Sequence, residues 1–363
     1  MLKLALAAAI SLMFVLEPAA AATRHKGHTT ASKRVKAKAA PAKIAVHARA
    51  ARRVVLVRNG RHRIVFQRVR HAAPAVAVLS AGEIAGLNRT TDPLELRSNV
   101  AYVMDQSSSE VLFEKNANVA LPIASITKLM TGLLVVQAQQ PLDEVLTITD
   151  ADVDRHKFTS SRLPVGARMT RGNLLHIALM SSENRAASAL GRNYPGGITA
   201  FVEAMNAKAK ELGMNDTHYV DSSGLSSQNV SSARDLAKLA ITAHQEPLLR
   251  QYTTDPNYAV QASGRTLQYH NTNYLVAMPD WNIGLQKTGF INEAGRCLVM
   301  QAMIQGRNVV MVFLDSKGKQ SRTADAGRMR RWLEALKPAA IPAGAAAGVP
   351  VTVSAAAAGP VVH

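Results

Sequence analysis

The pattern of apolar and polar positions first becomes regular about a quarter of the way along the chain. Residues 99–104 and 110–115 are rich in Val, Tyr and Phe and predict two strands, joined by the polar residues 106–109. The mostly apolar run at residues 129–136 predicts a buried helix, and residues 145–149 predict a short strand. This part of the chain is therefore expected to begin a mixed fold of strands and helices.

Between residues 174 and 239 the apolar positions follow a helical spacing. Residues 174–180 predict a buried helix, and Ser232 with Asp235 predicts a capping box at the start of another. A further helix carries an apolar stripe that Gly213 ends. The residues of this stripe are Phe201, Val202, Met205 and Leu212. We therefore expect an all-helical lobe inserted in the chain.

Strands return after this lobe. Residues 281–287 alternate in their apolar positions, and residues 297–304 and 308–314 flank residues 305–307 as a hairpin. Residues 322–336 predict a basic amphipathic helix. Strands and a helix, then a helical block, then strands and a helix describe an α+β domain. Its antiparallel sheet is expected to be flanked by helices.

The N-terminus has the three parts of a secretory signal peptide. Lys3 supplies a positive charge, and residues 4–16 form an apolar segment that is too short to span a bilayer. Ala20-Ala21-Ala22 offers a cleavage site of small residues. Residues 1–22 are therefore predicted to direct export, and we expect the mature protein in the periplasm, soluble or peripherally associated.

Most of the formal charge of +18 lies in the next segment. Residues 23–82 contain fifteen Lys or Arg and no Asp or Glu, whereas the chain from Glu83 onward has 27 basic and 24 acidic residues. Such a segment cannot bury enough apolar surface to fold alone, so residues 23–96 are predicted to form a disordered basic arm. As an alternative for part of it, Asn59-Gly60 predicts a short hairpin. The arm could contact an anionic wall or membrane surface, and export argues against nucleic acid as a partner.

The rest of the chain completes the predicted organisation. Residues 97–337 form the folded domain, and residues 338–363 form a flexible tail rich in Ala and Pro, without Lys, Arg, Asp or Glu. Cys297 is the only cysteine, so no intramolecular disulfide can form, and its apolar surroundings predict a buried, inert thiol. The spacing of His and Cys suggests no metal site, and no metal or organic cofactor is implied.

The first candidate for chemistry is the pair Ser125 and Lys128, at the start of the apolar run. On a helix these residues lie one turn apart on the same face. A serine hydroxyl needs a base within hydrogen-bond reach, and a lysine is such a base only when burial or a nearby cation lowers its pKa. The pair predicts serine attack, lysine as proton acceptor and a covalent acyl-enzyme. For an isolated Ser-x-x-Lys, a capping serine and a surface lysine would be the simpler explanation.

Two further triplets change this balance. Ser182-Glu183-Asn184 lies between two predicted helices, and Lys287-Thr288-Gly289 ends the alternating strand. Each triplet is weak alone: Ser182 could only cap a helix, with Ser181 as its neighbouring rival, and Lys287 could be a charge that protects an edge strand. Ser-x-x-Lys, Ser-x-Asn and Lys-Thr-Gly in this order form a specific combination.

These motifs resemble those of the penicillin-binding proteins and serine β-lactamases. The surrounding sequence is most similar to the low-molecular-mass D,D-peptidases, in particular the D-alanyl-D-alanine endopeptidase branch of the penicillin-binding-protein-7 type. The resemblance covers about residues 99–336 and leaves out the arm and the tail. It is carried by Ala124-Ser-Ile-Thr-Lys-Leu-Met130, Ser182-Glu-Asn-Arg-Ala-Ala187, Asp221-Ser-Ser-Gly-Leu225 and Lys287-Thr-Gly-Phe-Ile-Asn-Glu-Ala-Gly-Arg-Cys297.

The resemblance implies catalytic roles for the first two motifs. Ser125 would attack the carbonyl of a D-alanyl peptide bond, and Lys128, near a second cation, would take its proton. Ser182, with Lys128 as its neighbour, would relay a proton to the leaving amine. Asn184 would hold Lys128 or the substrate amide.

It also implies how the substrate is held. Lys287 and Thr288 would bind negative charge on the leaving side of the substrate, and Gly289 would let the substrate backbone lie against the strand edge. The backbone N–H groups of Ser125 and Phe290 would form the oxyanion hole. Water would then release the acyl group.

The substrate implied by the resemblance is the stem peptide of peptidoglycan, with β-lactams as covalent inhibitors. An endopeptidase that cleaves cross-links during wall remodelling is expected first. The reason is that many carboxypeptidases carry a β-rich C-terminal domain and an amphipathic anchor, where this chain has an uncharged tail. A D-alanyl-D-alanine carboxypeptidase stays the alternative.

Two other readings remain open with less support. A class A-like β-lactamase needs a glutamate-bearing loop, and the stretch from Glu246 to Leu249 lacks the Glu-x-x-Leu-Asn pattern. The second motif is also Ser-Glu-Asn rather than Ser-Asp-Asn. A non-catalytic wall-binding protein would not need all three motifs. The oligomeric state is not predicted.

Overall fold

The computed structural model describes residues 51–58, 61–68 and 78–336. The chain divides into two units near residue 75, and each is described by itself. The predicted signal peptide at residues 1–22 and the predicted tail at residues 338–363 lie outside the described residues, so both stay predictions.

The first unit contains a β-hairpin within the basic arm. Strand β1 (Ala51–Arg58) pairs antiparallel with β2 (Arg61–Arg68), with Arg58 opposite Arg61. This register leaves residues 59–60 for the turn, as the Asn59-Gly60 pair predicts. The arm therefore includes a paired segment.

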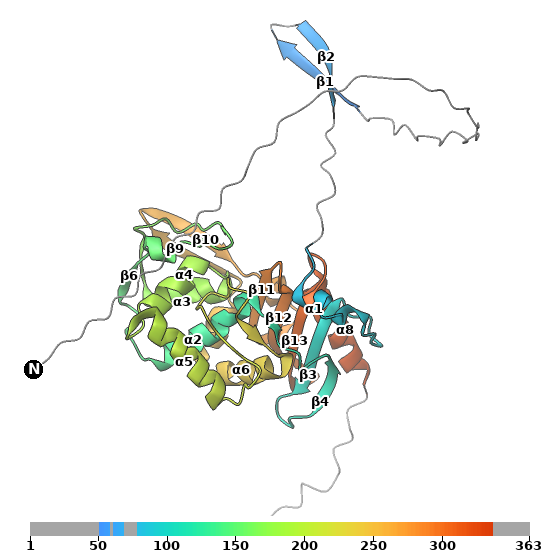
Figure 1. Ribbon diagram of the computed structural model, residues 1–363, viewed down its shortest axis with the longest axis vertical. Coiled ribbons are helices and arrows are strands. Elements are labelled where there is room, and N and C mark those ends of the chain that lie inside the picture. The colour runs from blue at the N-terminus through green and yellow to red at the C-terminus, as the bar shows by residue number, and fades with distance from the viewer. Residues whose placement is uncertain (1–50, 59–60, 69–77, 337–363) are drawn as a thin grey trace, which may run out of the picture. The chain divides into compact units, whose positions relative to one another are not determined.

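The second unit is built on a five-stranded antiparallel sheet, which confirms the α+β fold class (Figure 1). In spatial order the strands are β11 (Asn282–Ile291), β12 (Gly295–Ile304), β13 (Arg307–Ser316), β3 (Ser98–Asp105) and β4 (Val111–Lys115). The three C-terminal strands thus add to one side of the N-terminal pair. Strand β11, which carries the Lys-Thr-Gly triplet, lies at the edge of the sheet.

Alternation along the strands divides the apolar core between the two faces of the sheet. On β3, Val100 and Tyr102 pack with the helical lobe, whereas Ala101 and Val103 pack with helix α8 (Ser321–Ala335). Figure 1 shows α2 to α6 gathered on one side of the sheet and α8 on the other. The sheet is buried on both faces, which explains why its central strands are nearly continuous in apolar residues.

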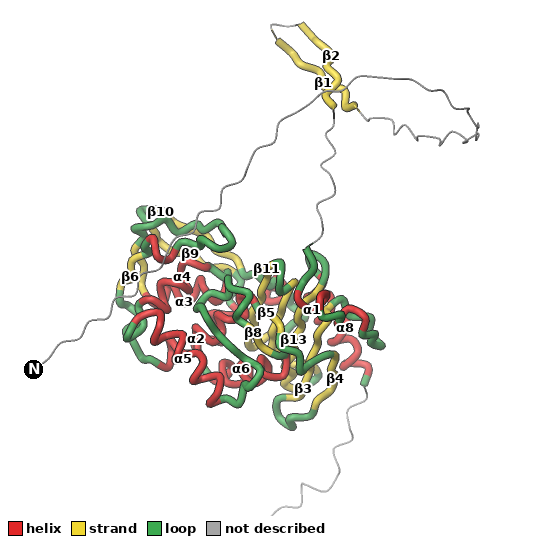
Figure 2. The backbone as a smooth tube through the Cα atoms, viewed as in Figure 1, coloured by secondary structure: helices red, strands yellow, loops and turns green. Residues whose placement is uncertain are grey.

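The helical lobe surrounds α2, whose residues from Thr127 to Val135 are all buried. A helix that is apolar all round belongs in a core. The helices of the lobe, red in Figure 2, are α2 (Thr127–Gln137), α3 (Arg171–Met180), α4 (Asn184–Arg192), α5 (Gly197–Glu211), α6 (Ala233–Gln245) and α7 (Pro247–Thr254). The predicted helical lobe is therefore present, with the Ser-x-x-Lys motif at its centre.

Short pairs of strands line this lobe and were not all predicted. Two of these pairs are β5 (Leu121–Pro122) with β8 (Val230–Ser231), and β6 (Val145–Thr147) with β7 (Arg168–Thr170). The third is a hairpin of β9 (Asn257–Ala262) and β10 (Arg265–His270). The Ser263-Gly264 pair is a sequence signal for the turn of this hairpin. In the structure both residues of the turn have positive φ.

The folded unit begins upstream of the predicted boundary at Arg97. Helix α1 (Ala81–Ile84) has a complete capping box between Ser80 and Glu83, and the backbone N–H of Ala81 donates to the carbonyl of Glu293. The signal Ser-x-x-Glu was present in the sequence. The capping box predicted at α6 is only half formed: Ser232 caps the helix, but Asp235 instead accepts hydrogen bonds from Asp216 and Thr217.

None of the helices in the described segments is long and apolar enough to cross a membrane.

Asp325 on α8 is predicted to be a major contributor to stability. Its buried carboxylate accepts hydrogen bonds from the backbone N–H groups of Arg97 and Ser98 and from the Ser98 hydroxyl, where β3 begins. Asp325→Ala leaves these buried donors unpaired and should lower the free energy of unfolding by about 3 kcal/mol in denaturant titrations. Asp280→Ala removes an exposed partner of Arg330 and should cost less than about 1 kcal/mol. Equal losses would contradict this account.

Candidate active site

Ser125 lies on a tight turn at the base of α2. It is the middle residue of the 3₁₀ helix η2 (Ala124–Ile126), and its side chain is half-buried. Ala124 has φ +49°, a left-handed conformation that is unfavourable for a residue with a Cβ. The turn is held in place by close packing, because a Cβ at Gly224 would lie 1.9 Å from the Ala124 carbonyl oxygen. The glycine of Asp221-Ser-Ser-Gly-Leu225 is thus required by the nucleophile turn.

The amine of Lys128 is completely buried and lies 3.0 Å from Ser125 Oγ. It also donates to the carbonyl oxygen of Ser223 at 2.6 Å and to Asn184 Oδ1 at 2.7 Å. A neutral amine has two N–H donors and one lone pair. The two carbonyl oxygens can only accept, so they use both N–H groups. The lone pair is then left for the hydroxyl of Ser125, which can donate its proton to it.

The same burial favours the neutral amine. It lowers the pKa of Lys128 from 10.5 to about 8, and the negative charges of Asp221 and Glu183 oppose this shift. A pKa near 8 leaves roughly one lysine in ten neutral at pH 7, about 300 times more than the usual pKa would. The predicted requirement for a lowered pKa is therefore met mainly by burial and not by a second cation.

The loop that follows α5 holds the Ser223 carbonyl on Lys128. The carboxylate of Asp221 accepts from the backbone N–H groups of Ser223, Gly224 and Ser226 at 2.6, 2.6 and 2.9 Å, and from the Ser223 hydroxyl at 2.8 Å. One carboxylate thus fixes the whole loop. The resemblance includes this motif, but it implied no role for Asp221.

Asn229 has a structural role that the sequence did not predict. Its buried side chain donates to Thr127 Oγ1 at 3.0 Å and to the Asp221 carbonyl at 2.9 Å, and it accepts from the N–H of Val220. Asn229 thereby ties the start of α2 to the loop that positions Lys128. No sequence pattern marks it, because Thr127 is 102 residues away in the chain and its partners in the loop follow no regular spacing.

Ser182 faces the other buried lysine. Its hydroxyl lies 3.0 Å from Lys287 Nζ, so the hydrogen bond of Ser182 is with Lys287, whereas the resemblance implied Lys128 as its neighbour. Its φ is +64°, a second strained position at the site. The capping role is excluded, because the N-cap of α4 is Glu183. The rival hydroxyl of Ser181 donates instead to the Ile177 carbonyl at 2.9 Å, at the end of α3.

Asn184 is the first residue of α4 and links both sides of the site. Its Oδ1 accepts from Lys128, and its Nδ2 donates to Thr159 Oγ1 at 3.0 Å. Of the two roles predicted for it, the structure therefore includes the contact with Lys128. Thr159 lies in the polar loop before α3. A turn in this loop is held by the backbone N–H groups of Lys157 and Thr159, which donate to the carboxylate of Asp154.

Lys287 is also completely buried, on β11. Burial lowers the pKa of its amine well below the usual value, and the charges of Lys128 and Arg322 lower it further. Its amine donates to Ser182 and to the Thr288 carbonyl, and the Thr288 hydroxyl is 2.6 Å from the hydroxyl of Thr272. Two buried lysines thus face the two candidate serines.

Gly289 lies where β11 meets the nucleophile turn. A Cβ at this position would lie 2.8 Å from the Ile123 carbonyl oxygen and 3.2 Å from the Ser125 nitrogen. The absence of a side chain is thus needed for the strand to approach Ser125, in addition to any contact with substrate. The Gly289 carbonyl accepts from Arg322 at 2.7 Å. This approach brings the predicted residues from three distant segments to one site.

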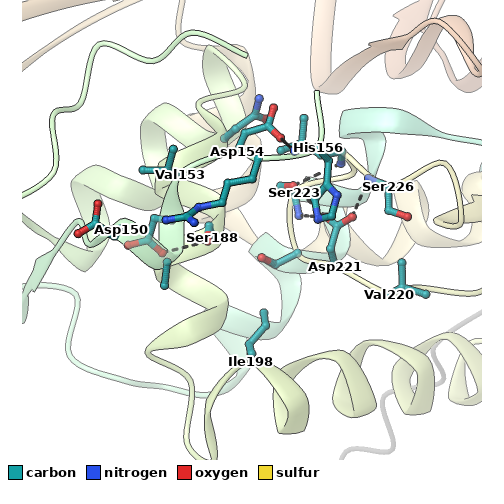
Figure 3. A pocket seen from close by; sticks show the side chains of 16 residues that line it. Asp150, Val153, Asp154, His156, Ser188, Ile198, Val220, Asp221, Ser223 and Ser226 are labelled. Carbon is teal, nitrogen blue, oxygen red and sulfur yellow. Dashed lines mark hydrogen bonds between the residues drawn. The ribbon is translucent and has the colours of Figure 1, made fainter. Parts of the chain in front are cut away.

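Open space lies on both sides of Asn184. A cavity of about 580 Å³ extends from Asn184 along Asp221 and Ser223, which Figure 3 shows beside His156. A second cavity of about 330 Å³ is lined by Ser182, Asn184 and the neighbouring loop. Ser182 and Asn184 thus border open space, whereas Ser125 lines neither of these two cavities.

The described part of the chain contains no group of three or more His, Cys, Asp or Glu side chains that could hold a metal ion. Cys297 is buried, and burial raises the pKa of its thiol to about 12, so it is unreactive as predicted.

Comparisons with known proteins show the family of this chain. The sequence profile of the D-alanyl-D-alanine carboxypeptidase family matches residues 87–318. A D-alanyl-D-alanine endopeptidase of Pseudomonas aeruginosa is 50% identical over 255 residues, which are 70% of this chain and 82% of that protein. A D-alanyl-D-alanine endopeptidase of Escherichia coli is 45% identical over 258 residues, 70% of this chain and 83% of that protein.

Solved structures show the same fold. The Streptomyces K15 DD-transpeptidase is 30% identical, with a TM-score of 0.63 over 68% of this chain and 100% of that one. Penicillin-binding protein D2 of Listeria monocytogenes, in its cefotaxime-bound form, is 30% identical, with a TM-score of 0.57 over 66% of this chain and 98% of that one.

We predict that acylation of Ser125 by a β-lactam depends on the neutral form of Lys128. Only the neutral amine can accept the hydroxyl proton, so the acylation rate should rise with pH, with a midpoint near 8, and level off above it. Lys128→Arg should slow acylation by at least about 10³-fold, because a guanidinium does not deprotonate in this range. Stopped-flow acylation kinetics would measure both effects. A flat profile between pH 6 and pH 10 would contradict the role of Lys128 as base.

The adjacent serines provide a matched pair of variants. Ser182→Ala removes the hydroxyl that contacts Lys287 and should reduce turnover of a peptide substrate by about 10²–10⁴-fold. Ser181→Ala removes only a bond to the end of α3 and should leave turnover within about 3-fold of wild type. Steady-state kinetics of both variants would decide which serine matters. A larger loss for Ser181→Ala would reverse the assignment.

Proposed function

The chain belongs to the D-alanyl-D-alanine carboxypeptidase family, and on this premise we propose that it is a serine D,D-peptidase that cleaves peptidoglycan stem peptides through an acyl-enzyme. One observation carries the proposal above all. The amine of Lys128 is buried, both its N–H groups are used by carbonyl acceptors, and its lone pair is left for Ser125 Oγ. This arrangement suits a base that activates a serine nucleophile.

In the proposed acylation step, Ser125 Oγ attacks the carbonyl carbon of a D-alanyl peptide bond while its proton passes to Lys128. The negative charge that develops on the carbonyl oxygen is held by the backbone N–H groups of Ser125 and Phe290. The close approach of Gly289 to the Ser125 nitrogen supports this pairing. One such donor commonly contributes about 3 kcal/mol of transition-state stabilisation.

The leaving amine takes its proton from Ser182. The proton that Lys128 accepted from Ser125 replaces it through this relay, so Lys128 is neutral again, while Lys287 holds the Ser182 hydroxyl in place by a hydrogen bond. Lys287 and Thr288 would also bind a carboxylate on the leaving residue by hydrogen bonds. The C–N bond breaks, and the acyl group stays on Ser125. A water then attacks the ester with Lys128 as base and frees the serine.

We further infer that the preferred bond is a cross-link, so that the enzyme is a D-alanyl-D-alanine endopeptidase. The support is that two relatives named D-alanyl-D-alanine endopeptidase are 50% and 45% identical, whereas a Streptomyces relative named D-alanyl-D-alanine carboxypeptidase is 30% identical. The family description favours the second candidate, a D-alanyl-D-alanine carboxypeptidase. β-Lactams would act as covalent inhibitors, in line with the cefotaxime-bound structure of a similar protein.

The location of the protein belongs to the same proposal. Residues 1–22 would direct export to the periplasm, where peptidoglycan lies, and residues 23–96 would bring a basic arm to an anionic wall or membrane surface. The catalytic domain, predicted at residues 97–337, would extend upstream to include α1 (Ala81–Ile84). The tail at residues 338–363 would act as a flexible extension.

The deciding experiment is labelling of the mature protein with a fluorescent penicillin, wild type beside Ser125→Ala. A stable labelled band in the wild type only is expected, because the acyl-enzyme forms at Ser125. Digestion of cross-linked and uncross-linked muropeptides then separates endopeptidase from carboxypeptidase. Rapid hydrolysis of the drug would favour a β-lactamase. An untouched drug would favour a non-catalytic wall-binding protein.

A further inference from the structure

A chain of side-chain hydrogen bonds runs from the polar loop before α3 to the candidate nucleophile. Asp154 Oδ2 lies 2.8 Å from the hydroxyl of Thr159, and Thr159 Oγ1 lies 3.0 Å from the side-chain nitrogen of Asn184. The oxygen of the same amide lies 2.7 Å from Lys128 Nζ, which is 3.0 Å from Ser125 Oγ. Asp154, labelled in Figure 3, and Asn184 both line the larger cavity of the site. The first two members of this chain lie outside the three motifs.

The carboxylate of Asp154 sets the direction of the bonds in this chain. Partial burial raises the pKa of this carboxyl, but hydrogen bonds from three backbone N–H groups and from the Thr159 hydroxyl outweigh that effect and lower the pKa to about 2. An ionised carboxylate can only accept, so the hydroxyl of Thr159 donates its one proton to it. Thr159 therefore presents only lone pairs to Asn184.

The direction passes on to the amide of Asn184. An amide has an NH₂ end that donates and an oxygen end that accepts. Because Thr159 can only accept from this amide, the NH₂ end is held toward Thr159 and the oxygen toward Lys128. The reversed amide would set two oxygen atoms against each other with no proton between them, which is unfavourable.

The orientation of this amide decides whether the lone pair of Lys128 is free. With the amide oxygen toward it, the neutral amine donates to Asn184 and to the Ser223 carbonyl, and its lone pair is left for the Ser125 hydroxyl. With the NH₂ end toward it, the amide would donate to the lone pair. The amine would then have only an N–H group for Ser125 and could not accept its proton.

We propose that Thr159 is a positioning residue for the base. Fixed by Asp154, its hydroxyl holds the Asn184 amide in the orientation that leaves the lone pair of the lysine available. The inference rests on the proposed function, in which Lys128 is the base, and deepens it. Thr159 acts through the amide and not by contact with the reacting atoms.

The test is the pH profile of β-lactam acylation in Thr159→Val, which removes the hydroxyl and keeps the shape of the side chain. The amide can then reverse whenever Lys128 is neutral, whereas an ammonium has no lone pair and keeps the oxygen toward it. An unreactive form of the neutral amine lowers the plateau of the rate and moves the midpoint to lower pH by the same factor. We expect a plateau at least about 5-fold lower and a midpoint about 0.7 pH unit lower, which corresponds to one lost hydrogen bond.

The shift of the midpoint separates this role from a merely structural one. The charges that act on Lys128 are those of Asp221, Glu183 and Lys287, and none of them changes in Thr159→Val. A loosened loop would admit water, and the pKa of Lys128 would rise toward that of an exposed lysine. A lower plateau with an unchanged or raised midpoint would contradict the proposal, and so would a wild-type profile.

Two further variants isolate the hydroxyl. Thr159→Ser keeps it and should stay within about 2-fold of wild type at every pH. Thr266→Val is the matched control, because Thr266 Oγ1 also accepts from an exposed side-chain amide, that of Gln261 at 2.8 Å, on the hairpin of β9 and β10. Its profile should equal that of wild type. A loss in either variant as large as in Thr159→Val would overturn the inference.

A double-mutant cycle tests whether the effect passes through Asn184. In Asn184→Ala no amide remains to be oriented, so adding Thr159→Val should change the acylation rate less than about 2-fold. A full additional loss in this background would overturn the inference. Thermal melting would verify that each variant is folded.

Failure of the inference and failure of the proposed function are distinguishable. A wild type that fluorescent penicillin labels at Ser125, with a Thr159→Val profile equal to it, would overturn the inference and leave the D,D-peptidase function intact. A folded wild type that is not labelled would overturn the proposed function, and this inference with it.

Discussion

The burial of one lysine amine is the constraint on which the rest of this structure depends. An ammonium in an apolar interior is costly, so burial shifts the Lys128 amine toward its neutral form. The same burial requires its N–H groups to be paired, and the carbonyl oxygens of Ser223 and Asn184 do this. What remains is a lone pair directed at Ser125. Desolvation and hydrogen-bond satisfaction together therefore make the neutral form of Lys128 more accessible and leave its lone pair for the Ser125 hydroxyl.

Several elements serve this arrangement from a distance. Helix α2 is buried on all sides, which removes water from around Lys128. The carboxylate of Asp221 organises the loop that presents the Ser223 carbonyl, and Asn229 joins that loop to the start of α2. The cost of the site is visible in the backbone, where Ala124 and Ser182 adopt left-handed conformations. Such strain persists only where the surrounding packing holds it.

The edge strand β11 completes the site because it can approach the nucleophile so closely. Gly289 permits the approach, and Lys287 brings a second buried amine to Ser182. An edge strand also offers unpaired backbone groups, to which an extended peptide can add. The sheet and the helical lobe thus contribute different parts of the candidate site, which lies where they meet.

The sequence by itself determined the α+β class, the helical lobe, the central strands and the three motifs, because periodicity and short-range spacing are properties of neighbouring residues. It also predicted that Ser125 and Lys128 share a helix face, and that Cys297 is buried. Only the tertiary structure decided that Ser182 pairs with Lys287, that Asn184 accepts from Lys128, and that the folded unit begins before Arg97. It also revealed Asn229 and the Ser223 carbonyl. These contacts join residues far apart in the chain, and their geometry follows from how the helical lobe packs on the sheet, which no local pattern encodes.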